Sequence, residues 1–322
     1  MHQNEQRTLA VIGTGVIGNG WITRFLANGY DVVAFDPAVG AEARTHQNVE
    51  RAWISMEEIG LAEGAARNRI TFVRTIEEAV KDAYVIQENV PEREDLKKKV
   101  LEEIDLHANP EAIIGSSTSG IKPSTLQENL THPERLIVAH PFNPVNILPL
   151  VELVGGQGTE QTTIDRAVEF YESIQMKPLV VQREIEGHVA DRLMEALWRE
   201  ALHLVNDGIA TTEEVDAAIV YGAGLRWAQM GPFLTFHLAG GEKGMRHMLE
   251  QFGPALKLPW TKLEAPELTD ELKEKVVEGC ESHAGDMSVS KMEDRRDEFL
   301  VKLIDLVEDY WPESRSLAKS GQ

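Results

Sequence analysis

The chain has 322 residues, 42% of them hydrophobic and 26% charged, and 53 acidic residues against 32 basic ones give it a formal net charge of -21. This length and composition predict a soluble globular protein of about two domains, and the acidic excess disfavours nucleic acid or an anionic membrane as a partner. The single cysteine, Cys280, excludes an intrachain disulfide, and the polar start without an apolar signal region favours a cytoplasmic protein.

The first predicted elements form one compact motif. An apolar strand over residues 8–12 leads into a glycine-rich turn, a helix follows over residues 19–28, and a second strand over residues 31–35 is followed by Asp36. The turn has the sequence Gly13-Thr14-Gly15-Val16-Ile17-Gly18. Strand, glycine turn, helix, strand and acid within about thirty residues are typical of a dinucleotide-binding fold.

Each glycine of this turn has an expected task. Gly13 permits the tight turn, Gly15 lets the backbone approach a pyrophosphate, and Gly18 lets helix and strand pack closely. Exposed N–H groups at the helix start would hold the phosphates. Asp36 would accept hydrogen bonds from the adenosine ribose and repel the extra phosphate of NADP, so NAD is the predicted cofactor. A glycine-rich turn in some other α/β protein is the alternative.

Further strands are predicted over residues 70–73, 83–87, 112–115, 136–139, 151–154 and 179–181, with helical patterns between them, notably over 92–107 and 162–174. This alternation predicts an α/β fold with a Rossmann-like doubly wound, mostly parallel sheet. From His188 onward only helices are expected, including helices over residues 189–206 and 234–252. We therefore expect an NAD-binding Rossmann-like domain over residues 1–185 and an all-helical substrate and dimerisation domain over residues 186–322.

Polar stretches follow several of these strands, at the edge where ligands bind to such sheets. Residues 88–92 lead into three consecutive lysines that include Lys97, and the hydroxyl-rich segment 116–120 includes Ser119. By themselves these residues favour ordinary turns and a solvated helix face.

A histidine and a glutamate give the strongest chemical signal. His140 ends the predicted strand 136–139, and Pro141 and Pro144 are expected to stop the chain from continuing as regular sheet. Glu152 lies inside the next apolar run, where a carboxylate is costly to bury without a partner. A histidine oriented by a glutamate can transfer protons. Without further signals, the residues favour a structural histidine with Glu152 turned to solvent.

In the second half, the aromatic residues suggest two interpretations. Most of them fit a hydrophobic core, but they could also form an aromatic cage around a quaternary ammonium. The candidates for such a cage are Trp198, Trp227, Phe233 and Phe236. The histidines of this half show no metal-ligand spacing with acids or Cys280, so no metal site is expected.

Together these motifs resemble the 3-hydroxyacyl-CoA dehydrogenase family over nearly the whole chain. The matching features are the glycine turn with Asp36, the segment Ser116-Ser117-Thr118-Ser119, the run His140-Pro141-Phe142-Asn143-Pro144 with Glu152, and Met230-Gly231-Pro232. The resemblance implies that Ser119 hydrogen-bonds the reacting oxygen, that His140 is the base and that Glu152 orients it. It further implies that Glu92 and Lys97 face the cofactor. The resemblance thus replaces the structural interpretation of the histidine.

Within this family, the run Gly224-Leu225-Arg226-Trp227-Ala228 is similar to a branch that acts on free hydroxy acids. One departure matters, because the family usually has asparagine where this chain has Asp191. An ionised aspartate cannot donate a hydrogen bond to a developing alkoxide, but it could attract a substrate cation. An ion pair of Asp191 with Arg192 or another base is the alternative.

The combined expectation is an NAD-dependent dehydrogenase that oxidises the 3-hydroxyl of a small hydroxy acid carrying a quaternary ammonium. Arg226 is the candidate partner of the substrate carboxylate, and Asp191 with the aromatic side chains is the candidate for the cation. The expected substrate-binding residues are Asn143, Trp198, Arg226, Phe233 and Phe236. Another 3-hydroxy acid or 3-hydroxyacyl-CoA dehydrogenase, and a non-catalytic NAD-binding protein of the lambda-crystallin type, remain alternatives. The resemblance also suggests a homodimer through the helical domain.

Overall fold

The structure is a computed structural model that describes residues 7–228, 230–264, 267, 269–275, 277, 286 and 289–310, so Cys280 lies outside the described part. The chain forms two compact units that divide between Asp191 and Arg192, and each unit is described by itself. None of the helices in the described part is long and apolar enough to cross a membrane.

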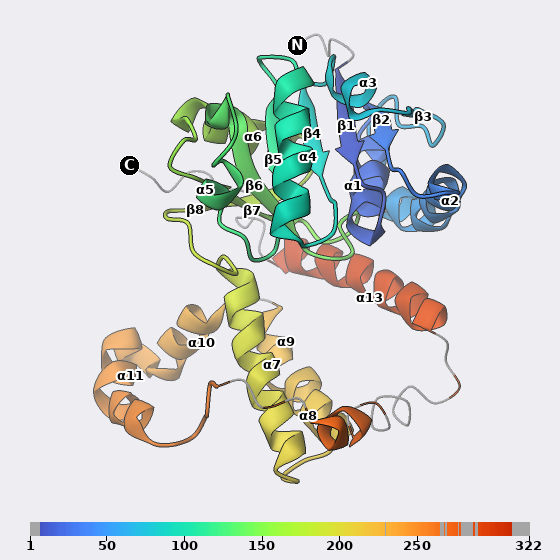
Figure 1. The fold of residues 1–322 in the computed structure, drawn as a ribbon. Coiled ribbons are helices and arrows are strands. Elements are labelled where there is room, and N and C mark those ends of the chain that lie inside the picture. Colours follow the sequence, from blue (N-terminus) through green and yellow to red (C-terminus); the bar gives the residue numbers. More distant parts are fainter. Residues whose placement is uncertain are drawn as a thin grey trace. The chain divides into compact units, whose positions relative to one another are not determined.

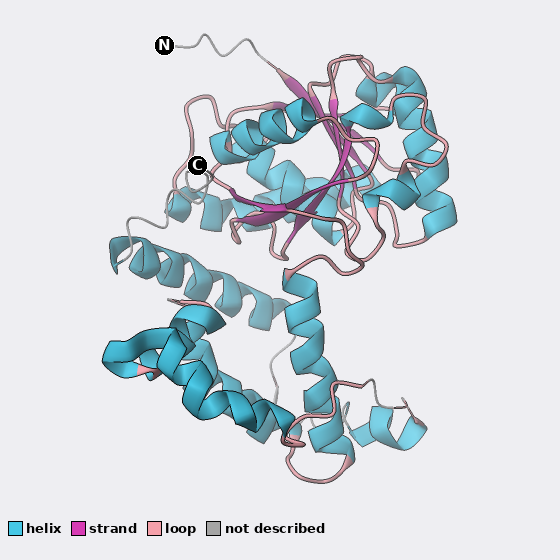
Figure 2. Ribbon diagram, turned by 90° about the vertical axis from the view of Figure 1, so that its left-hand side faces the viewer, coloured by secondary structure: helices cyan, strands magenta, loops and turns pink. Residues whose placement is uncertain are grey.

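The first unit is built on one sheet of eight strands in the order β3-β2-β1-β4-β5-β6-β7-β8 (Figure 1), and helices pack around this sheet (Figure 2). The pairs from β3 to β6 are parallel, β6 and β7 are antiparallel, and β7 and β8 are again parallel. The predicted mostly parallel, doubly wound sheet is therefore confirmed. The strands are β1 (Thr8–Ile12), β2 (Asp31–Phe35), β3 (Ile70–Phe72), β4 (Val85–Glu88), β5 (Ile113–Ser116), β6 (Leu136–Pro141), β7 (Leu150–Gly155) and β8 (Lys177–Val181).

Helices cover both faces of the sheet, which explains why its central strands are apolar runs without alternation. In β1, Leu9 and Val11 belong to one core, whereas Ala10 and Ile12 belong to the other. The first core also takes side chains from α1 (Val16–Ala27), α2 (Ala41–Ile59) and α6 (Gln161–Ser173). The second core takes them from α3 (Ile76–Val80), α4 (Glu94–His107) and α5 (Pro123–Leu126).

Strand β6 is longer than the sequence indicates. We expected a strand over residues 136–139 and an interruption of the sheet by Pro141, but His140 and Pro141 both belong to β6, and they pair with Glu152 and Val151 of β7. A proline lacks the N–H donor but keeps its carbonyl, so a sheet accommodates it at the end of a strand. The prediction was wrong by two residues, and the difference places His140 directly opposite Glu152.

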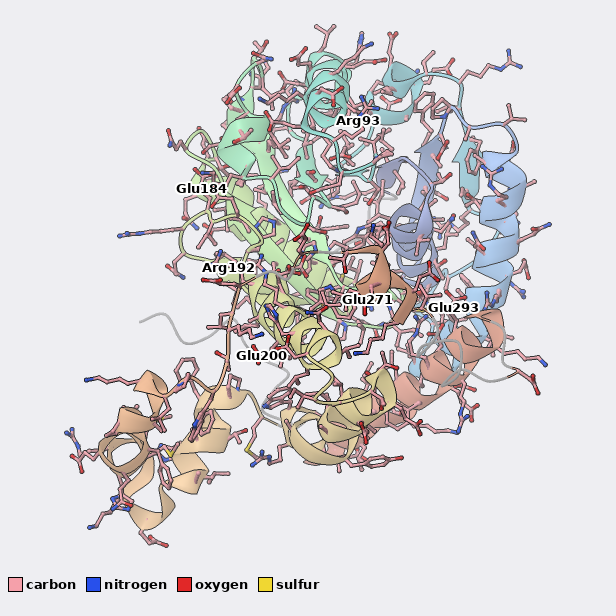
Figure 3. The ribbon with its side chains drawn as sticks, turned by 60° about the horizontal axis from the view of Figure 1, so that its bottom comes forward. Arg93, Glu184, Arg192, Glu200, Glu271 and Glu293 are labelled. Carbon is pink, nitrogen blue, oxygen red and sulfur yellow. The ribbon has the colours of Figure 1, made fainter. Side chains whose placement is uncertain are left out.

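Strand β8 is followed by the segment that connects the two units. Glu184 of this segment accepts a hydrogen bond of 2.9 Å from the backbone N–H of Ser124, at the start of α5 (Figure 3). A short 3-10 turn, η1 (Pro133–Arg135), precedes β6.

Beyond β8, the described residues form helices and no strand. The helices are α7 (Ala190–Asn206), α8 (Thr212–Ala218), the π-helix η2 (Ile219–Ala223), α9 (Gly224–Trp227), α10 (Pro232–Ala239), the 3-10 turns η3 (Gly241–Lys243) and η4 (Gly253–Lys257), α11 (Gly244–Phe252) and α13 (Val289–Tyr310). On α7, Glu200 accepts a 2.9 Å hydrogen bond from the backbone N–H of Lys262 (Figure 3).

One helical prediction in this unit is wrong. The single helix expected over residues 234–252 is divided into α10 and α11. Gly241 and Gly244 both have φ of +61°, a left-handed conformation that ends a helix. A side chain at Gly244 would also collide with the His237 ring, because its Cβ would lie 2.6 Å from that ring. The apolar spacing continues across the break, so periodicity alone could not locate it.

Candidate active site

The glycine turn between β1 and α1 has the shape that a dinucleotide requires. Gly13 has φ of +87°, and a Cβ at Gly18 would lie 2.0 Å from the Gly13 carbonyl oxygen, so neither position accommodates a side chain. A Cβ at Gly15, in contrast, would meet no atom within 4 Å. No side chain caps the start of α1, which leaves its first N–H groups to an external acceptor. The turn therefore fits the pyrophosphate of NAD.

Asp36 closes this turn from the end of β2. Its carboxylate accepts hydrogen bonds from the backbone N–H and the hydroxyl of Thr14, at 2.7 and 3.0 Å, and from the backbone N–H of Ala38 at 2.8 Å. A carboxylate has about four acceptor positions, so a ribose hydroxyl can still donate to it. The contact with Thr14 was not anticipated, and it joins the acid to the turn. On α1, the side chain of Val16 is exposed beside the turn, whereas Ile17 packs against the core.

His140 and Glu152 face each other across β6 and β7. The His140 Nδ1 lies 3.0 Å from Glu152 Oε2, and the two side chains are 6% and 0% exposed. Glu152 Oε1 accepts hydrogen bonds of 2.9 Å from the backbone N–H groups of Val189 and Ala190. The alternative in which Glu152 turns to solvent is therefore wrong.

The contacts of Glu152 determine its charge and the tautomer of its partner. Burial raises the pKa of this carboxyl, but the hydrogen bonds from His140 and from the two backbone N–H groups outweigh burial and hold the pKa below its ordinary value. An ionised carboxylate only accepts hydrogen bonds, so Nδ1 of His140 carries the proton that the pair shares. In the neutral imidazole, Nε2 is then the basic nitrogen.

Three further side chains surround the His140 ring. Asp191, in the first turn of α7, places Oδ2 3.5 Å from Nε2 of His140. The Phe142 ring meets the imidazole edge to face at 5.3 Å between centroids. The His188 ring lies 5.5 Å away and is fully buried. His188, which no sequence motif singled out, has φ of +46° and directs Nε2 to the Thr118 carbonyl oxygen at 3.2 Å.

Glu92 fixes the loop that carries Ser119. Its Oε1 accepts hydrogen bonds from the backbone N–H groups of Ser119 and Gly120, both at 3.1 Å, and from the hydroxyl of Thr118. The Ser119 residue itself is exposed. Glu92 and His188 thus hold the backbone of this loop by hydrogen bonds to Thr118, Ser119 and Gly120, and the serine stays exposed.

Lys97 differs from the expected solvated lysine. Its side chain is 2% exposed and its Nζ lies 3.0 Å from Glu88 Oε1 and 3.5 Å from Glu92 Oε2. The neighbouring Lys98 has an 18% exposed side chain and pairs with Glu94 and Glu128, whose side chains are 55% and 60% exposed. Glu88 is fully buried and also accepts a hydrogen bond from Ser116. We overlooked Glu88, although an acid at the end of the apolar strand β4 was the available signal.

A second buried network lies behind His140. Gln87 donates to the carbonyl of Ala139, the residue before His140, at 3.2 Å and to the Ser117 hydroxyl at 2.8 Å. The indole of Trp21 also donates to Ser117, at 3.1 Å. Tyr171 donates to Gln87 at 2.7 Å, and burial raises the pKa of its phenol, which keeps it a neutral donor. This network connects α1, β4, β5, β6 and α6.

Most of the predicted substrate-binding residues lie in the second unit. Trp198 is on α7, Arg226 on α9, and Phe233 and Phe236 on α10, and the three aromatic side chains are at least 49% exposed. Within the described part of the chain, no ring contact joins these three side chains. Asn143 is in the first unit, exposed and followed by the cis peptide bond to Pro144. Among the described residues, no group of three or more His, Cys, Asp or Glu could hold a metal ion.

Comparison with known proteins places the chain in a family. The NAD-binding domain of 3-hydroxyacyl-CoA dehydrogenases matches residues 8–185, and the C-terminal domain of the same enzymes matches residues 187–279. An L-carnitine dehydrogenase of Oceanobacillus iheyensis is 73% identical over 306 residues, which are 95% of this chain and 100% of that protein. An L-carnitine dehydrogenase of Bacillus cereus is 66% identical over 312 residues, which are 97% and 96% of the two chains.

A solved structure agrees with this placement. The chain is similar to 5-formyl-3-hydroxy-2-methylpyridine 4-carboxylic acid 5-dehydrogenase, an NAD+-dependent dismutase, with a TM-score of 0.79 and 26% identity over 94% of this chain and 98% of that one. The protein is thus an NAD-dependent dehydrogenase that acts on a CH–OH group. The chain belongs to the 3-hydroxyacyl-CoA dehydrogenase family.

Proposed function

We propose that the protein oxidises the 3-hydroxyl of L-carnitine to the ketone of 3-dehydrocarnitine, with NAD as the oxidant. The observation that carries the proposal is the buried pair of His140 and Glu152, which leaves Nε2 of His140 as the basic nitrogen, 3.5 Å from the carboxylate of Asp191. Two relatives that are 73% and 66% identical over nearly the whole chain, and are named for this reaction, support the choice of substrate.

In this mechanism the histidine is the general base. Nε2 of His140 takes the proton of the substrate hydroxyl while a hydride leaves C3, the carbon that carries this hydroxyl. Glu152 stabilises the resulting imidazolium through Nδ1–H. The exposed Ser119 binds the reacting oxygen. NAD, when bound, supplies the acceptor for the hydride. The glycine turn with residues 13–18, Asp36, Glu92 and Lys97 would hold NAD, and the last two also keep the Ser119 loop in place.

The remaining substrate contacts are proposed from residue chemistry. A guanidinium binds a carboxylate through two parallel hydrogen bonds, which makes Arg226 the proposed partner of the carnitine carboxylate. Aromatic faces attract quaternary ammonium groups, so Trp198, Phe233 and Phe236 are proposed for the trimethylammonium. Asn143 follows β6 by two residues and is proposed to contact the substrate near the base.

A panel of substrates tests the proposed reaction. The purified protein is mixed with NAD at alkaline pH and with L-carnitine, D-carnitine, L-gulonate or 3-hydroxybutyryl-CoA, and NADH formation is followed by absorbance. We expect L-carnitine to give the highest kcat/KM. A higher kcat/KM with L-gulonate or the acyl-CoA would show that L-carnitine is not the preferred substrate, although the protein would still be a dehydrogenase. Turnover of none of the four, with NAD bound, would favour a non-catalytic role of the lambda-crystallin type.

A further inference from the structure

The carboxylate of Asp191 occupies an unusual position for a proton-transfer site. Its Oδ2 lies 3.5 Å from Nε2 of His140, the nitrogen that must receive the substrate proton. The side chain is 21% exposed, so it is accessible at the surface of the site. With Glu152 at Nδ1, a single imidazole is flanked by carboxylates on both ring nitrogens. The reacting hydroxyl must therefore bind beside a negative charge.

The position of the Asp191 carboxylate is determined by neighbouring parts of the chain. Asp191 is in the first turn of α7, where the N–H groups of the helix favour an anion, and it follows directly after the two residues whose N–H groups bind Glu152. His188, three residues before Asp191, is anchored to the Thr118 carbonyl. The other ring nitrogen of His188, Nδ1, is buried without a hydrogen-bond partner in the described part of the chain. This nitrogen can therefore form a hydrogen bond with a bound ligand or a water molecule.

The proposed substrate carries its positive charge next to its reacting group. In carnitine the hydroxyl is on C3 and the trimethylammonium nitrogen is on C4, so ordinary bond lengths place oxygen and nitrogen about 3 to 4 Å apart. A hydroxyl at Nε2 of His140 consequently brings the cation into the reach of Asp191 Oδ2. A quaternary ammonium has no N–H, so it is recognised by charge and contact rather than by a directed hydrogen bond.

We propose that Asp191 is the counter-ion of the substrate's quaternary ammonium and that it selects cationic 3-hydroxy acids over neutral ones of the same shape. This inference rests on the proposed oxidation of L-carnitine. A substrate with a neutral carbon in place of the nitrogen would lose the attraction between its cation and Asp191 Oδ2, which lies 3.5 Å from Nε2 of His140. Asp191 is then the residue that determines specificity, beside the base rather than at a distance from it.

The test compares two substrates that differ in one atom. In 3-hydroxy-5,5-dimethylhexanoate a neutral quaternary carbon replaces the nitrogen of carnitine, and the shape is kept. We expect the native protein to prefer L-carnitine by about a hundredfold in kcat/KM, since a partly buried ion pair contributes on this scale. In Asp191→Asn the preference should fall at least about tenfold, chiefly through KM for L-carnitine, and in Asp191→Glu it should largely return. Asp165→Asn, the same change on the exposed face of α6, is the control.

The possible results distinguish a role of Asp191 in substrate selection from an effect on His140 alone and from a failure of the proposed function. If Asp191→Asn lowers kcat for both substrates equally and leaves the preference intact, Asp191 acts on His140 alone and the proposal is wrong. If this variant turns over neither substrate, L-carnitine binding in the presence of NADH, measured by calorimetry against the neutral analogue, provides the same comparison. If the native protein itself ignores L-carnitine but oxidises another hydroxy acid, the proposed function fails before Asp191 is tested.

Discussion

The three glycines of the first turn serve different purposes, and substitution can separate them. A methyl group at Gly15 meets no protein atom, whereas one at Gly18 would lie 2.0 Å from the Gly13 carbonyl oxygen. We expect Gly15→Ala to leave the free energy of unfolding nearly unchanged and to raise the dissociation constant of NAD by about tenfold or more, because the methyl occupies phosphate space.

Gly18→Ala provides the contrast, since it should destabilise the protein by about 1–3 kcal/mol through overpacking. Urea unfolding and NAD titration of both variants measure the two effects. Unchanged NAD binding in a folded Gly15→Ala protein would contradict the assignment of the turn.

His188 gives the protein a specific dependence of stability on pH. Burial lowers its pKa, and the nearby His140 lowers it further, so the folded protein keeps this imidazole neutral where the unfolded chain, with a pKa of about 6.5, is protonated. The unfolded state then binds more protons, and stability falls as the pH decreases below about 6.5.

In His188→Gln the amide can still donate to Thr118 but does not titrate. We therefore expect the loss of stability between pH 7 and pH 5.5, measured by urea unfolding, to be smaller in this variant than in the native protein. Equal losses of stability in the two proteins would show that the pKa of His188 is not lowered in the folded state.

At the scale of the elements, α4 is attached to β4 by a buried ion pair. The side chain of Lys97 is 2% exposed and its nearest partner, Glu88, is completely buried, whereas the side chain of Lys98 is 18% exposed and its partners are exposed. Removing one member of a buried ion pair leaves the other charge buried without a partner, which lowers the free energy of unfolding by about 3–5 kcal/mol.

We therefore expect Lys97→Ala to lower the free energy of unfolding by about this amount and Lys98→Ala to change it little. Chemical denaturation of the two variants measures the difference. Similar effects would mean that Glu88 is protonated or hydrated and that the pair does not stabilise the sheet.

Sequence alone predicted the elements far better than their contacts. The glycine turn and the doubly wound sheet followed from local signals, because hydrophobic periodicity and turn chemistry are local properties. The pairing of His140 with Glu152 followed from the family resemblance, since the residues alone favoured a Glu152 turned to solvent. The burial of Lys97 could not be predicted, because only the packing of α4 on the sheet determines which of the three adjacent lysines is buried. The contact of Asp191 with His140 joins residues 51 positions apart across two elements, so no local pattern could reveal it.

At the scale of the whole molecule, α7 exposes an apolar surface. Leu193, Met194 and Leu197 are between 45% and 57% exposed, and only Leu202 and Val205 of this helix are buried. A stripe of this kind on one helix is more typical of an interface than of a free surface. We propose that the helical unit forms a homodimer through this surface.

The oligomeric state tests this proposal. Light scattering after gel filtration should give twice the mass of the chain, and Leu197→Glu should shift the protein toward the monomer, while Glu195→Gln on the same helix serves as the control. A monomer at all concentrations would contradict the assignment of α7 to an interface.

The proposed catalysis depends on the imidazole of His140, which Glu152 orients and whose Nε2 is proposed to take the substrate proton. The most direct measurement is the steady-state kcat of His140→Ala with L-carnitine, together with NAD binding by titration. We expect kcat to fall by at least about a hundredfold, the contribution of a positioned base, while the dissociation constant of NAD stays within about a factor of three because the glycine turn is untouched. A variant that binds NAD and retains most of its kcat would contradict the account.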